Sequence, residues 1–423
     1  MSAQTIILLA GWGAISSVWL GLIVAQRRAR RDGLFLDEPV PPRTASEPRA
    51  SARVAVGSAE ASAQGYMPSV CVVIAARNES EGLAGCLRHV LAQDYPDLSV
   101  IVIDDRSEDD TLAVAQALAQ ADPRVQVKRI EHLPPKWMGK SHALWRGTRE
   151  LVADWLLFMD VDCSLQPHAV SRAIQEVRRR DLDLLSLWPQ QAAGGFWEHA
   201  TIPLCGGIIA LWFGAGRAND PRSARAFANG QFLLVRRAAY ERIGGHESVR
   251  SALIEDIPFA EHARRSGLAC WVASGRELVC VRMYRSYGAI VNGWARIYVG
   301  ALRSGTKIAL SIAWLLLGSL LPYAAAVALA AAIYRGGMTG DGTRTDHLVL
   351  AAQCVNHLTL MMIASYRFWG MGGCRRIDLI WYPLSVCVVV RILAQAWWWL
   401  VIRRSIPWRN TRYAIDGKGR IVE

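Results

Sequence analysis

The feature that most constrains this chain of 423 residues is a set of long apolar runs without charge. Residues 5–24 and 308–333 contain no Asp, Glu, Lys or Arg. A helix of about twenty apolar residues crosses the hydrocarbon core of a bilayer, so either run is long enough to span. Hydrophobic residues make up 52% of the sequence and charged residues 20%, which also favours a membrane protein over a wholly soluble one.

The first run predicts an N-terminal anchor over residues 1–26. The basic sequence QRRARRDG follows it directly, and basic flanks of membrane helices stay in the cytoplasm, so the N-terminus is expected outside. A cleaved signal peptide is the alternative, but its charges precede the apolar run. Residues 27–67 are basic, rich in Pro and Ala and without sustained periodicity, which is typical of a flexible linker.

A membrane region is also expected over residues 301–402, where apolar runs at 347–369 and 377–402 follow the one at 308–333. Three crossings would place the basic tail, residues 403–423, outside, against the preference of basic residues for the cytoplasm. An arginine such as Arg391 is costly in mid-membrane. We therefore expect about two spans and a broken or re-entrant hairpin at 377–402, with three clean crossings as the alternative.

Between these membrane regions the pattern changes to short β-branched runs that alternate with helical stretches. Strand, helix and strand at this spacing predict an α/β domain with a mostly parallel sheet over residues 68–300. Ligands of such sheets bind at the carboxyl ends of the strands. The predicted strands are 69–76, 98–105, 125–130 and 154–160, and the predicted helices are 81–94 and 111–121.

The net charge narrows the class of partner, and the cysteine spacing indicates the redox compartment. The formal net charge of +12 fits a nucleic acid, an anionic membrane surface or an anionic substrate. No helix-turn-helix, zinc-finger or RNP pattern is present, so nucleic acid is not expected. The nine cysteines lack CxxC or Cys/His spacing, so we expect buried apolar cysteines in a reducing compartment.

Polar clusters occur where the predicted strands end. Asp-rich strand ends are common turns, and acidic residues are favourable at a helix start, so each cluster alone has a structural explanation. A buried carboxylate without partners costs several kcal/mol, however, which favours a ligand at such positions. The clusters are Arg77-Asn78-Glu79, Asp104-Asp105, Gly139-Lys140, Asp160-Val161-Asp162 and Glu255-Asp256.

In this order the clusters resemble the inverting family-2 glycosyltransferases of the GT-A fold. The resemblance covers residues 69–300 and rests on RNE, DD, GK, DVD with Pro167, and ED. Residues 227–267 and 282–287, together with the membrane segments, are similar to enzymes that glycosylate membrane lipids. These include the hopanoid-associated and carotenoid-type glycosyltransferases and, more distantly, the ceramide glucosyltransferases.

The resemblance implies a donor side of the site. Asp162, helped by Asp160, would hold Mg²⁺ or Mn²⁺, because oxygen ligands suit these ions and a cation neutralises the leaving diphosphate. Asp160 is expected mainly on the donor sugar or ribose. Lys140 would meet a phosphate or a sugar hydroxyl, with a solvated surface lysine as the alternative. The nucleotide would be bound by Arg77, Asn78, Glu79, Asp104 and Asp105.

The resemblance also implies an acceptor side. Inversion needs a general base that deprotonates the acceptor, and Asp256 matches that role, with Glu255 as the second candidate. Gly230 and Gln231 would allow close backbone approach to a substrate, although a plain glycine at the start of a strand is an alternative.

Two further segments bear on the acceptor. NGWARIYVG at residues 292–300 is a degenerate form of the family's Q/R-x-x-R-W sequence, so Trp294 and Arg296 either contact acceptor or pyrophosphate or anchor the membrane interface. Residues 202–216 are too short to span and would form a core helix or a membrane-lying surface. Arg296, Arg303 and Lys307 suit anionic headgroups.

The expected protein is thus a multi-pass glycosyltransferase of the inner membrane with a cytoplasmic catalytic domain. It would move a sugar from a nucleotide-diphospho-sugar, expected to be a UDP-sugar, to a lipid acceptor. A processive polysaccharide synthase is the alternative enzyme, and a non-catalytic membrane scaffold is the alternative of another class. The sequence leaves the sugar, the lipid, the choice between Mg²⁺ and Mn²⁺, and the oligomeric state open.

Overall fold

The computed structural model describes residues 3–31, 67–223, 225–339, 344–408 and 411–422, and its chain divides into two compact units. The helical unit comprises Met1–Asp32, Ala193–Leu211 and Tyr284–Arg404, and the sheet unit comprises Gly33–Ala192, Trp212–Met283 and Ser405–Glu423. Residues 193–211 and 284–300 therefore group with the apolar helices, whereas the expected catalytic domain was continuous from 68 to 300. Most of the expected linker, residues 32–66, lies outside the described residues.

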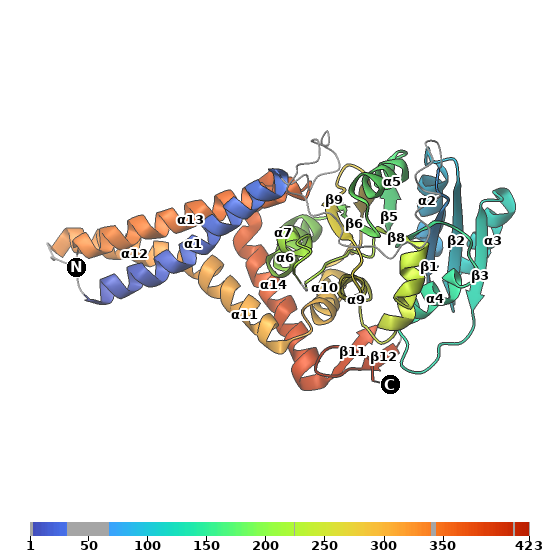
Figure 1. Ribbon diagram of the computed structural model, residues 1–423. Coiled ribbons are helices and arrows are strands. Elements are labelled where there is room, and N and C mark those ends of the chain that lie inside the picture. The colour runs from blue at the N-terminus through green and yellow to red at the C-terminus, as the bar shows by residue number, and fades with distance from the viewer. Residues whose placement is uncertain (1–2, 32–66, 224, 340–343, 409–410, 423) are drawn as a thin grey trace. The chain divides into compact units, whose positions relative to one another are not determined.

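The sheet unit is built on a seven-stranded sheet in the order β3-β2-β1-β4-β8-β6-β9 (Figure 1). Neighbouring strands are parallel except at β8, which is antiparallel to β4 and to β6. This confirms the prediction of an α/β fold with a mostly parallel sheet. The strands are β1 Val70–Ala76, β2 Leu98–Asp105, β3 Val125–Ile130, β4 Trp155–Met159, β6 Leu184–Trp188, β8 Leu233–Arg236 and β9 Cys270–Ser274.

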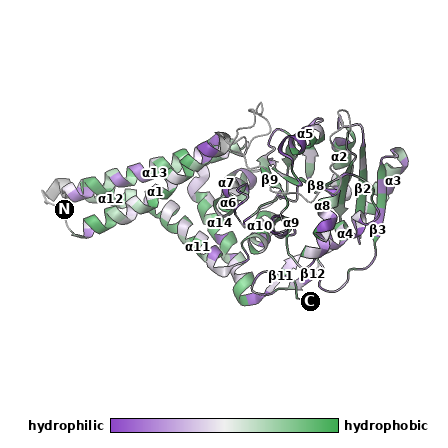
Figure 2. Ribbon diagram, viewed as in Figure 1, coloured by the Kyte–Doolittle hydropathy of each residue, from purple (hydrophilic) through white to green (hydrophobic). Residues whose placement is uncertain are grey.

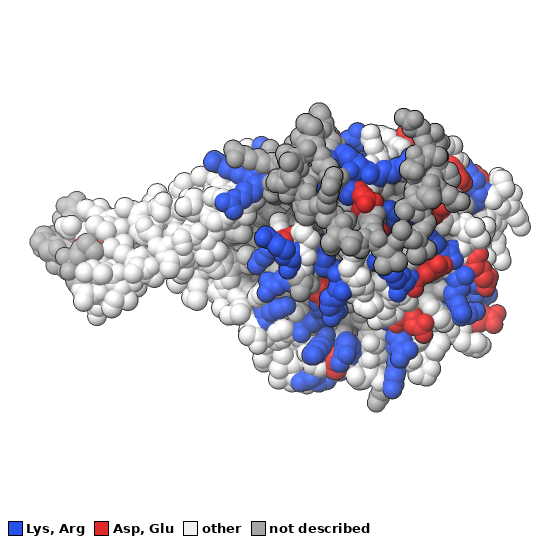
Figure 3. Space-filling view, in the orientation of Figure 1, with Lys and Arg blue, Asp and Glu red and all other residues white. Residues whose placement is uncertain are grey.

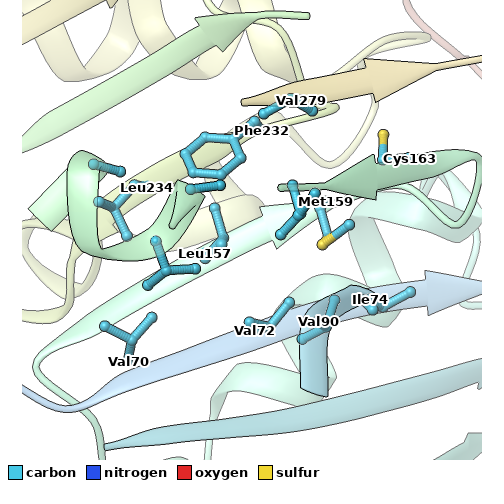
Figure 4. Close-up of a cluster of buried hydrophobic side chains, with 14 of the residues drawn as sticks. Val70, Val72, Ile74, Val90, Leu157, Met159, Cys163, Phe232, Leu234 and Val279 are labelled. Atoms are coloured by element: carbon cyan, nitrogen blue, oxygen red, sulfur yellow. The ribbon is translucent and has the colours of Figure 1, made fainter. Parts of the chain in front are cut away.

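The apolar runs become strands because the sheet is buried on both faces. Along β1, Val70, Val72 and Ile74 enter one hydrophobic cluster, whereas Cys71 and Val73 enter a second cluster. Figure 4 shows part of the first cluster, in which side chains of β1, β4 and β8 meet. Successive side chains of a strand point to opposite faces, so a strand with two buried faces needs an unbroken apolar run.

Helices cover both faces of this sheet. Leu83, Leu87 and Val90 of α2 recur at helical spacing and are all buried in the first cluster. The helices with residues in the first cluster are α2 Ser80–Leu91, α3 Thr111–Ala121 and α5 Ala169–Arg180. Those with residues in the second are α4 Gly139–Thr148, α8 Arg237–Arg242 and α9 Asp256–Arg265. A three-stranded sheet is formed by β5 Cys163–Leu165, β10 Val279–Val281 and β7 Gln190–Gln191.

The C-terminal tail also belongs to the sheet unit. Strands β11 (Ser405–Trp408) and β12 (Thr411–Ala414) pair antiparallel, and Arg420 forms a β-bridge with Ala252. The segment expected as a basic tail is thus a folded part of this unit.

The helical unit contains the apolar helices, and Figure 2 shows hydrophobic residues along α1, α12 and α13. Among the described residues, five helices are long and apolar enough to cross a membrane: Ala3–Arg28, Phe196–Ala218, Gly305–Arg335, Thr345–Met371 and Arg376–Arg403. The helices are α1 Ala3–Arg31, α6 Phe196–Phe213, α10 Tyr287–Leu302, α11 Gly305–Leu315, α12 Leu321–Thr339, α13 Arg344–Met371 and α14 Tyr382–Trp397.

A buried histidine inside these helices is hydrogen-bonded to neighbouring helical segments. His357 of α13 is fully buried; its Nδ1 lies 3.0 Å from Ser16 Oγ of α1, and its Nε2 lies 2.9 Å from the Gly318 carbonyl. Polar groups in apolar helices are stable when neighbouring helices satisfy them. The face seen in Figure 3 is almost free of charged side chains along α1, α12 and α13, as expected of lipid-facing helices.

Two segments differ from the expectation. Residues 202–216 lie mostly in α6, which begins at Phe196 and so exceeds the short helix expected there. Residues 376–403 form one continuous helical segment without reversal, so the expected hairpin is not formed. Pro383 lies in the first turn of α14, where its missing N–H breaks no helical hydrogen bond. Arg391 finds a partner within the unit, because its Nη1 donates to Tyr287 Oη at 2.5 Å.

Candidate active site

Lys140, at the start of α4, joins three of the sequence clusters. Its Nζ lies 2.6 Å from Asp160 Oδ1 and 2.7 Å from Glu255 Oε1. Burial alone would lower the pKa of Lys140, but the two carboxylates raise it well above its ordinary value. Lys140 is therefore a charged group between two carboxylates at the carboxyl end of β4, and we call Lys140, Asp160 and Glu255 together the node. The Lys140 side chain is not the solvated surface lysine of the alternative interpretation.

Asp256 lies next to this node at the first turn of α9. The Gly230 N–H donates to Asp256 Oδ2 at 2.9 Å, and the Ile257 N–H donates to Oδ1 at 2.7 Å. Burial and the adjacent charge of Glu255 raise the pKa of Asp256 to about 7. A carboxyl group with a pKa near neutrality has the property that a general base needs at cellular pH.

Gly230 fits where a larger residue would crowd the node. A Cβ at this position would lie 3.2 Å from Glu255 Oε1 and 3.3 Å from Lys140 Nζ. The absence of a side chain lets the Gly230 N–H reach Asp256. The prediction of close backbone approach at Gly230 thus has a geometric basis, although the partner here is a carboxylate of the protein.

Asp160 and Asp162 follow β4 and differ in their surroundings. Asp160 is paired with Lys140, whereas Asp162 accepts a weak bond from the Cys163 thiol at 3.6 Å. Desolvation and the charge of Asp160 raise the pKa of Asp162 to about 7. Two repelling carboxylates are a favourable environment for a hard divalent cation. The residues present therefore fit such an ion.

The protein alone does not complete a metal shell. No group of three or more His, Cys, Asp and Glu side chains that could hold a metal occurs among the described residues. Mg²⁺ and Mn²⁺ take about six oxygen ligands and accept them from substrate phosphates and water. A cation at Asp162 and Asp160 would thus depend on further ligands from outside the chain.

Asp104 and Asp105 are adjacent in sequence but have different environments. Arg106 donates to Asp105 Oδ1 at 2.8 Å and Oδ2 at 3.1 Å. A Cβ at Gly139 would collide with Asp105 Oδ2, so the glycine brings the start of α4 against this carboxylate. Asp104 is fully buried, and its nearest charged partner is Arg129 Nε at 3.8 Å. The Asp105 side chain therefore lies against the start of α4, next to Lys140, whereas Asp104 is buried beside Arg129.

The loop after β1 is tied to the loop after β2. Asn78 adopts a left-handed conformation with φ 52°, and its Oδ1 accepts from the Glu108 N–H at 2.8 Å. The Glu79 N–H donates to Thr111 Oγ1 at 2.7 Å. Asn78 thus shapes the loop that follows Asp105, while Arg77 is half-buried beside it.

Sequence reasoning missed the polar groups that support the node. His246 is buried, its Nδ1 lies 3.0 Å from Tyr240 Oη, and desolvation lowers its pKa to about 4, so it is neutral. Asn229 Oδ1 accepts from the Gln231 N–H at 3.0 Å, and Gln231 is itself buried. The polar letters of FANGQ were a usable signal for Asn229, whereas nothing in the sequence marks His246 as buried.

Trp294 and Arg296 lie on α10 of the helical unit. Trp294 is buried against Tyr298, so its ring is not an exposed interfacial anchor. Arg296 Nη2 donates to Tyr284 Oη at 3.4 Å.

The acidic groups and Lys140 thus lie at the carboxyl edge of a mostly parallel sheet, where α/β folds bind their ligands. Residues 71–244 match the family model described as Glycosyl transferase family 2, so the chain carries a family-2 glycosyltransferase domain, as predicted. The chain is 24% identical over 357 residues to 4,4'-diaponeurosporenoate glycosyltransferase of Staphylococcus aureus strain MRSA252, covering 82% of this chain and 89% of that one. The same enzyme of strain USA300 gives the same identity and coverage.

The fold is also similar to a solved structure, a mannosyltransferase from Pyrobaculum calidifontis in complex with GDP-Man and Mn²⁺. The TM-score is 0.51 at 16% identity, and the match covers 92% of this chain and 99% of that one. The predictions of a GT-A fold and of a glycosyltransferase enzyme are confirmed.

Proposed function

We propose that this protein is a membrane-bound inverting glycosyltransferase that moves a sugar from a nucleotide-diphospho-sugar to a lipid acceptor. The observation that carries the proposal is the meeting of Lys140, Asp160, Glu255 and Asp256 around Gly230 at the carboxyl edge of the sheet. Carboxylates serve as bases and metal ligands, and a lysine complements phosphate charge. One point thus combines the groups that sugar transfer from a diphosphate needs.

Asp256 is assigned as the general base. With a pKa of about 7 it exists in both protonation states near neutral pH, so it can take the acceptor proton. The two backbone N–H groups on its oxygens fix the direction of the carboxylate. Glu255 is assigned a positioning role, because its carboxylate is paired with Lys140.

Donor binding is assigned to the residues at the ends of β1, β2 and β4, together with Lys140. Asp105, held by Arg106 and Gly139, faces the nucleotide, with Arg77, Asn78 and Glu79 in the neighbouring loop. Lys140 holds Asp160 and supplies positive charge to the diphosphate. Asp162, with Asp160, would hold Mg²⁺ or Mn²⁺, and such a cation stabilises the charge of the leaving diphosphate.

The named relatives support the substrate classes. The Staphylococcus aureus relative is named for a diaponeurosporenoate acceptor, which supports an isoprenoid-type lipid acceptor here. The Pyrobaculum calidifontis structure contains GDP-Man and Mn²⁺, which supports a nucleotide-sugar donor and a divalent cation. The family resemblance favours a UDP-sugar, so UDP- and GDP-sugars are compared in the assay below.

We propose a multi-pass protein of the inner membrane whose sheet unit stays in the cytoplasm, and the chain connectivity then limits which apolar segments cross. The chain leaves the sheet unit at residue 193 and re-enters it after residue 211. It leaves again at residue 284 and re-enters after residue 404. A segment that returns to its starting side crosses a membrane an even number of times. We therefore propose that α6 does not cross, and that only two of the three apolar segments between 305 and 403 cross.

The segment 376–403 is assigned as the one that stays at the membrane surface. It exposes Ile380, Trp381, Trp398 and Ile402 together with Arg391, and a mid-helix arginine is less costly at the headgroups than in the bilayer centre. Native Cys387, which is exposed on this segment, should react with a membrane-impermeant maleimide added to inverted membrane vesicles. A C387S variant gives the background, and labelling only from the periplasmic side would contradict the assignment.

The transfer itself is tested by mass spectrometry of lipids from cells with and without the protein, and by the purified protein with UDP- and GDP-sugars. Asp256→Asn should abolish transfer and leave donor binding nearly unchanged. Asp97→Asn, at an exposed position before β2, is the matched control and should stay active. An active Asp256→Asn variant would remove the base assignment. A long polymer on a gel would favour the processive synthase. If the purified protein shows neither transfer nor metal-dependent donor hydrolysis, the result would favour the scaffold.

A further inference from the structure

The described C-terminal residues that follow the last apolar segment fold into a compact element, which we call the tail hairpin (405–408 and 411–422). After β11 and β12 the chain turns back, and Ile415 pairs with Ile421 in an antiparallel bridge. The Asp416 N–H donates to the Arg420 carbonyl at 2.9 Å, and the Arg420 guanidinium pairs with Asp416 Oδ2 at 2.8 Å. Ile406, Ile415 and Ile421 are buried, so the tail hairpin has an apolar interior.

The tail hairpin contacts the loop that leads into the acidic pair. The Ile421 N–H donates to the Ser251 carbonyl at 2.9 Å, and Arg420 pairs with Ala252. Leu253, the next residue of this loop, is buried, and two residues further on Glu255 is the N-cap of α9, which begins at Asp256. The tail hairpin thus fixes the backbone three to five residues before the acidic pair.

A second backbone bond holds the same loop from the donor side. The Met138 N–H donates to the Arg250 carbonyl at 2.7 Å, and Met138 directly precedes Gly139 and Lys140. Residues 250–252 are therefore held between the start of α4 and the tail hairpin. Loss of either bond would let the loop, and with it Glu255, move relative to Lys140.

The tail hairpin also borders the nucleotide side. The side chain of Tyr413 on β12 is one of the groups that raise the pKa of Arg106, after the larger effects of burial, which lowers it, and of Asp105, which raises it. Arg106 is the residue that holds Asp105. The hairpin therefore contacts the loop before Asp256 and carries a titratable side chain within electrostatic range of Arg106.

We propose that the tail hairpin is a positioning element of the transfer site, acting through the Ile421 N–H on the loop 250–256. The inference rests on the proposed function and extends it to a segment outside the family-matched residues 71–244. Because only Arg404 separates Ser405 from the apolar segment that ends at Arg403, the geometry of the acidic pair is linked through one short chain to the end of that segment.

The test compares Ile421→Pro with Ile421→Ala in the full-length protein. Both lose the buried side chain, but only proline removes the N–H that bonds to Ser251. We expect Ile421→Pro to lower kcat for sugar transfer at least tenfold while the donor KM changes less than twofold, and Ile421→Ala to lower kcat less than threefold. A purely structural role would lower the amount of folded enzyme without separating the two variants in this way.

A cross-link makes the result independent of a folding defect. The Ile421 N–H to Ser251 carbonyl bond makes Ala252 and Arg420 a non-hydrogen-bonded antiparallel pair, whose Cα atoms lie about 4.5 Å apart, within disulfide range. Oxidised Ile421→Pro/Ala252→Cys/Arg420→Cys should regain kcat to within threefold of wild type and lose it again on reduction, with the oxidised wild type as control.

Two outcomes overturn the role of the tail hairpin: a wild-type kcat in Ile421→Pro, or a lost kcat that the disulfide does not restore. Absence of transfer by the wild-type protein would instead contradict the proposed function, so the two failures are distinguishable.

Discussion

The pairing of Lys140 makes a quantitative prediction for Lys140→Met, which keeps an unbranched chain but removes the charge. The variant leaves Asp160 and Glu255 without their shared cation. Removing one partner of a buried ion pair costs about 3–5 kcal/mol, and an exposed pair contributes about 0–1 kcal/mol. The side chains here are 26%, 31% and 9% exposed for Lys140, Asp160 and Glu255, which places the expected loss between these limits, at about 2–3 kcal/mol.

The loss is measured as a shift of the thermal unfolding midpoint in detergent, followed by tryptophan fluorescence. For a domain of this size, 1 kcal/mol corresponds to about 2–4 °C, so a fall of about 4–12 °C is expected together with loss of transfer. Lys128→Met is the matched control, since Lys128 pairs with Glu150, which is 82% exposed. That variant should shift the midpoint by about 4 °C at most.

Two further measurements separate charge from packing. Lys140→Met/Glu255→Gln removes one of the two carboxylates and should regain about 1 kcal/mol without regaining transfer. Without Lys140 the carboxylates are easier to protonate, so the destabilisation should shrink as the pH is lowered toward about 5. A Lys140→Met midpoint no lower than that of Lys128→Met would refute the reasoning.

Three other predictions follow from the site. Because the pKa of Asp256 is raised to about 7, kcat/KM should fall as the pH drops below about 7, and an activity plateau extending to pH 5 contradicts the assignment. Protonated Asp256 should also favour the folded state, so this contribution to stability is lost as the pH rises through 7. Gly139→Ala should abolish donor binding, because its Cβ collides with Asp105, whereas Gly288→Ala, where nothing lies within 4 Å, should be neutral in both binding and transfer. Saturating Mn²⁺ with UDP should raise the unfolding midpoint of wild type by the equivalent of about 2–3 kcal/mol but leave Asp162→Asn unchanged, and an equal shift in both would exclude Asp162 as a ligand.

The sheet and the acidic edge could be predicted from sequence because their signals are local. Unbroken apolar runs marked β1, β2 and β4, and the ends of these runs placed Asp105 and Asp160 at one edge. The difference between Asp104 and Asp105 could not be predicted, since neighbouring residues of a strand face opposite sides and the covering helices decide which side is open.

The misjudged segments depended on contacts distant in sequence. The partner of Arg391 is Tyr287, on a different helix, so the arginine argued wrongly for a broken segment. The basic residues of the tail indicated an unfolded basic segment, whereas Ile406, Ile415 and Ile421 are buried in the structure. The pairing of Lys140 with Glu255 likewise joins residues that only the fold brings together.

The single antiparallel strand of the large sheet has a consequence for how the site can vary. Because β8 runs against β4, the residues that precede β8 arrive at the edge where β4 ends, and Leu233 pairs with Phe158. Gly230 therefore reaches the node from the beginning of a strand, while Asp105 and Asp160 reach it from strand ends. Changes in length before residue 229 can alter the surroundings of the acidic pair without shifting the register of any strand that carries Asp105 or Asp160. The part of the site that precedes β8 can thus change in length and sequence independently of the strand ends that carry Asp105 and Asp160.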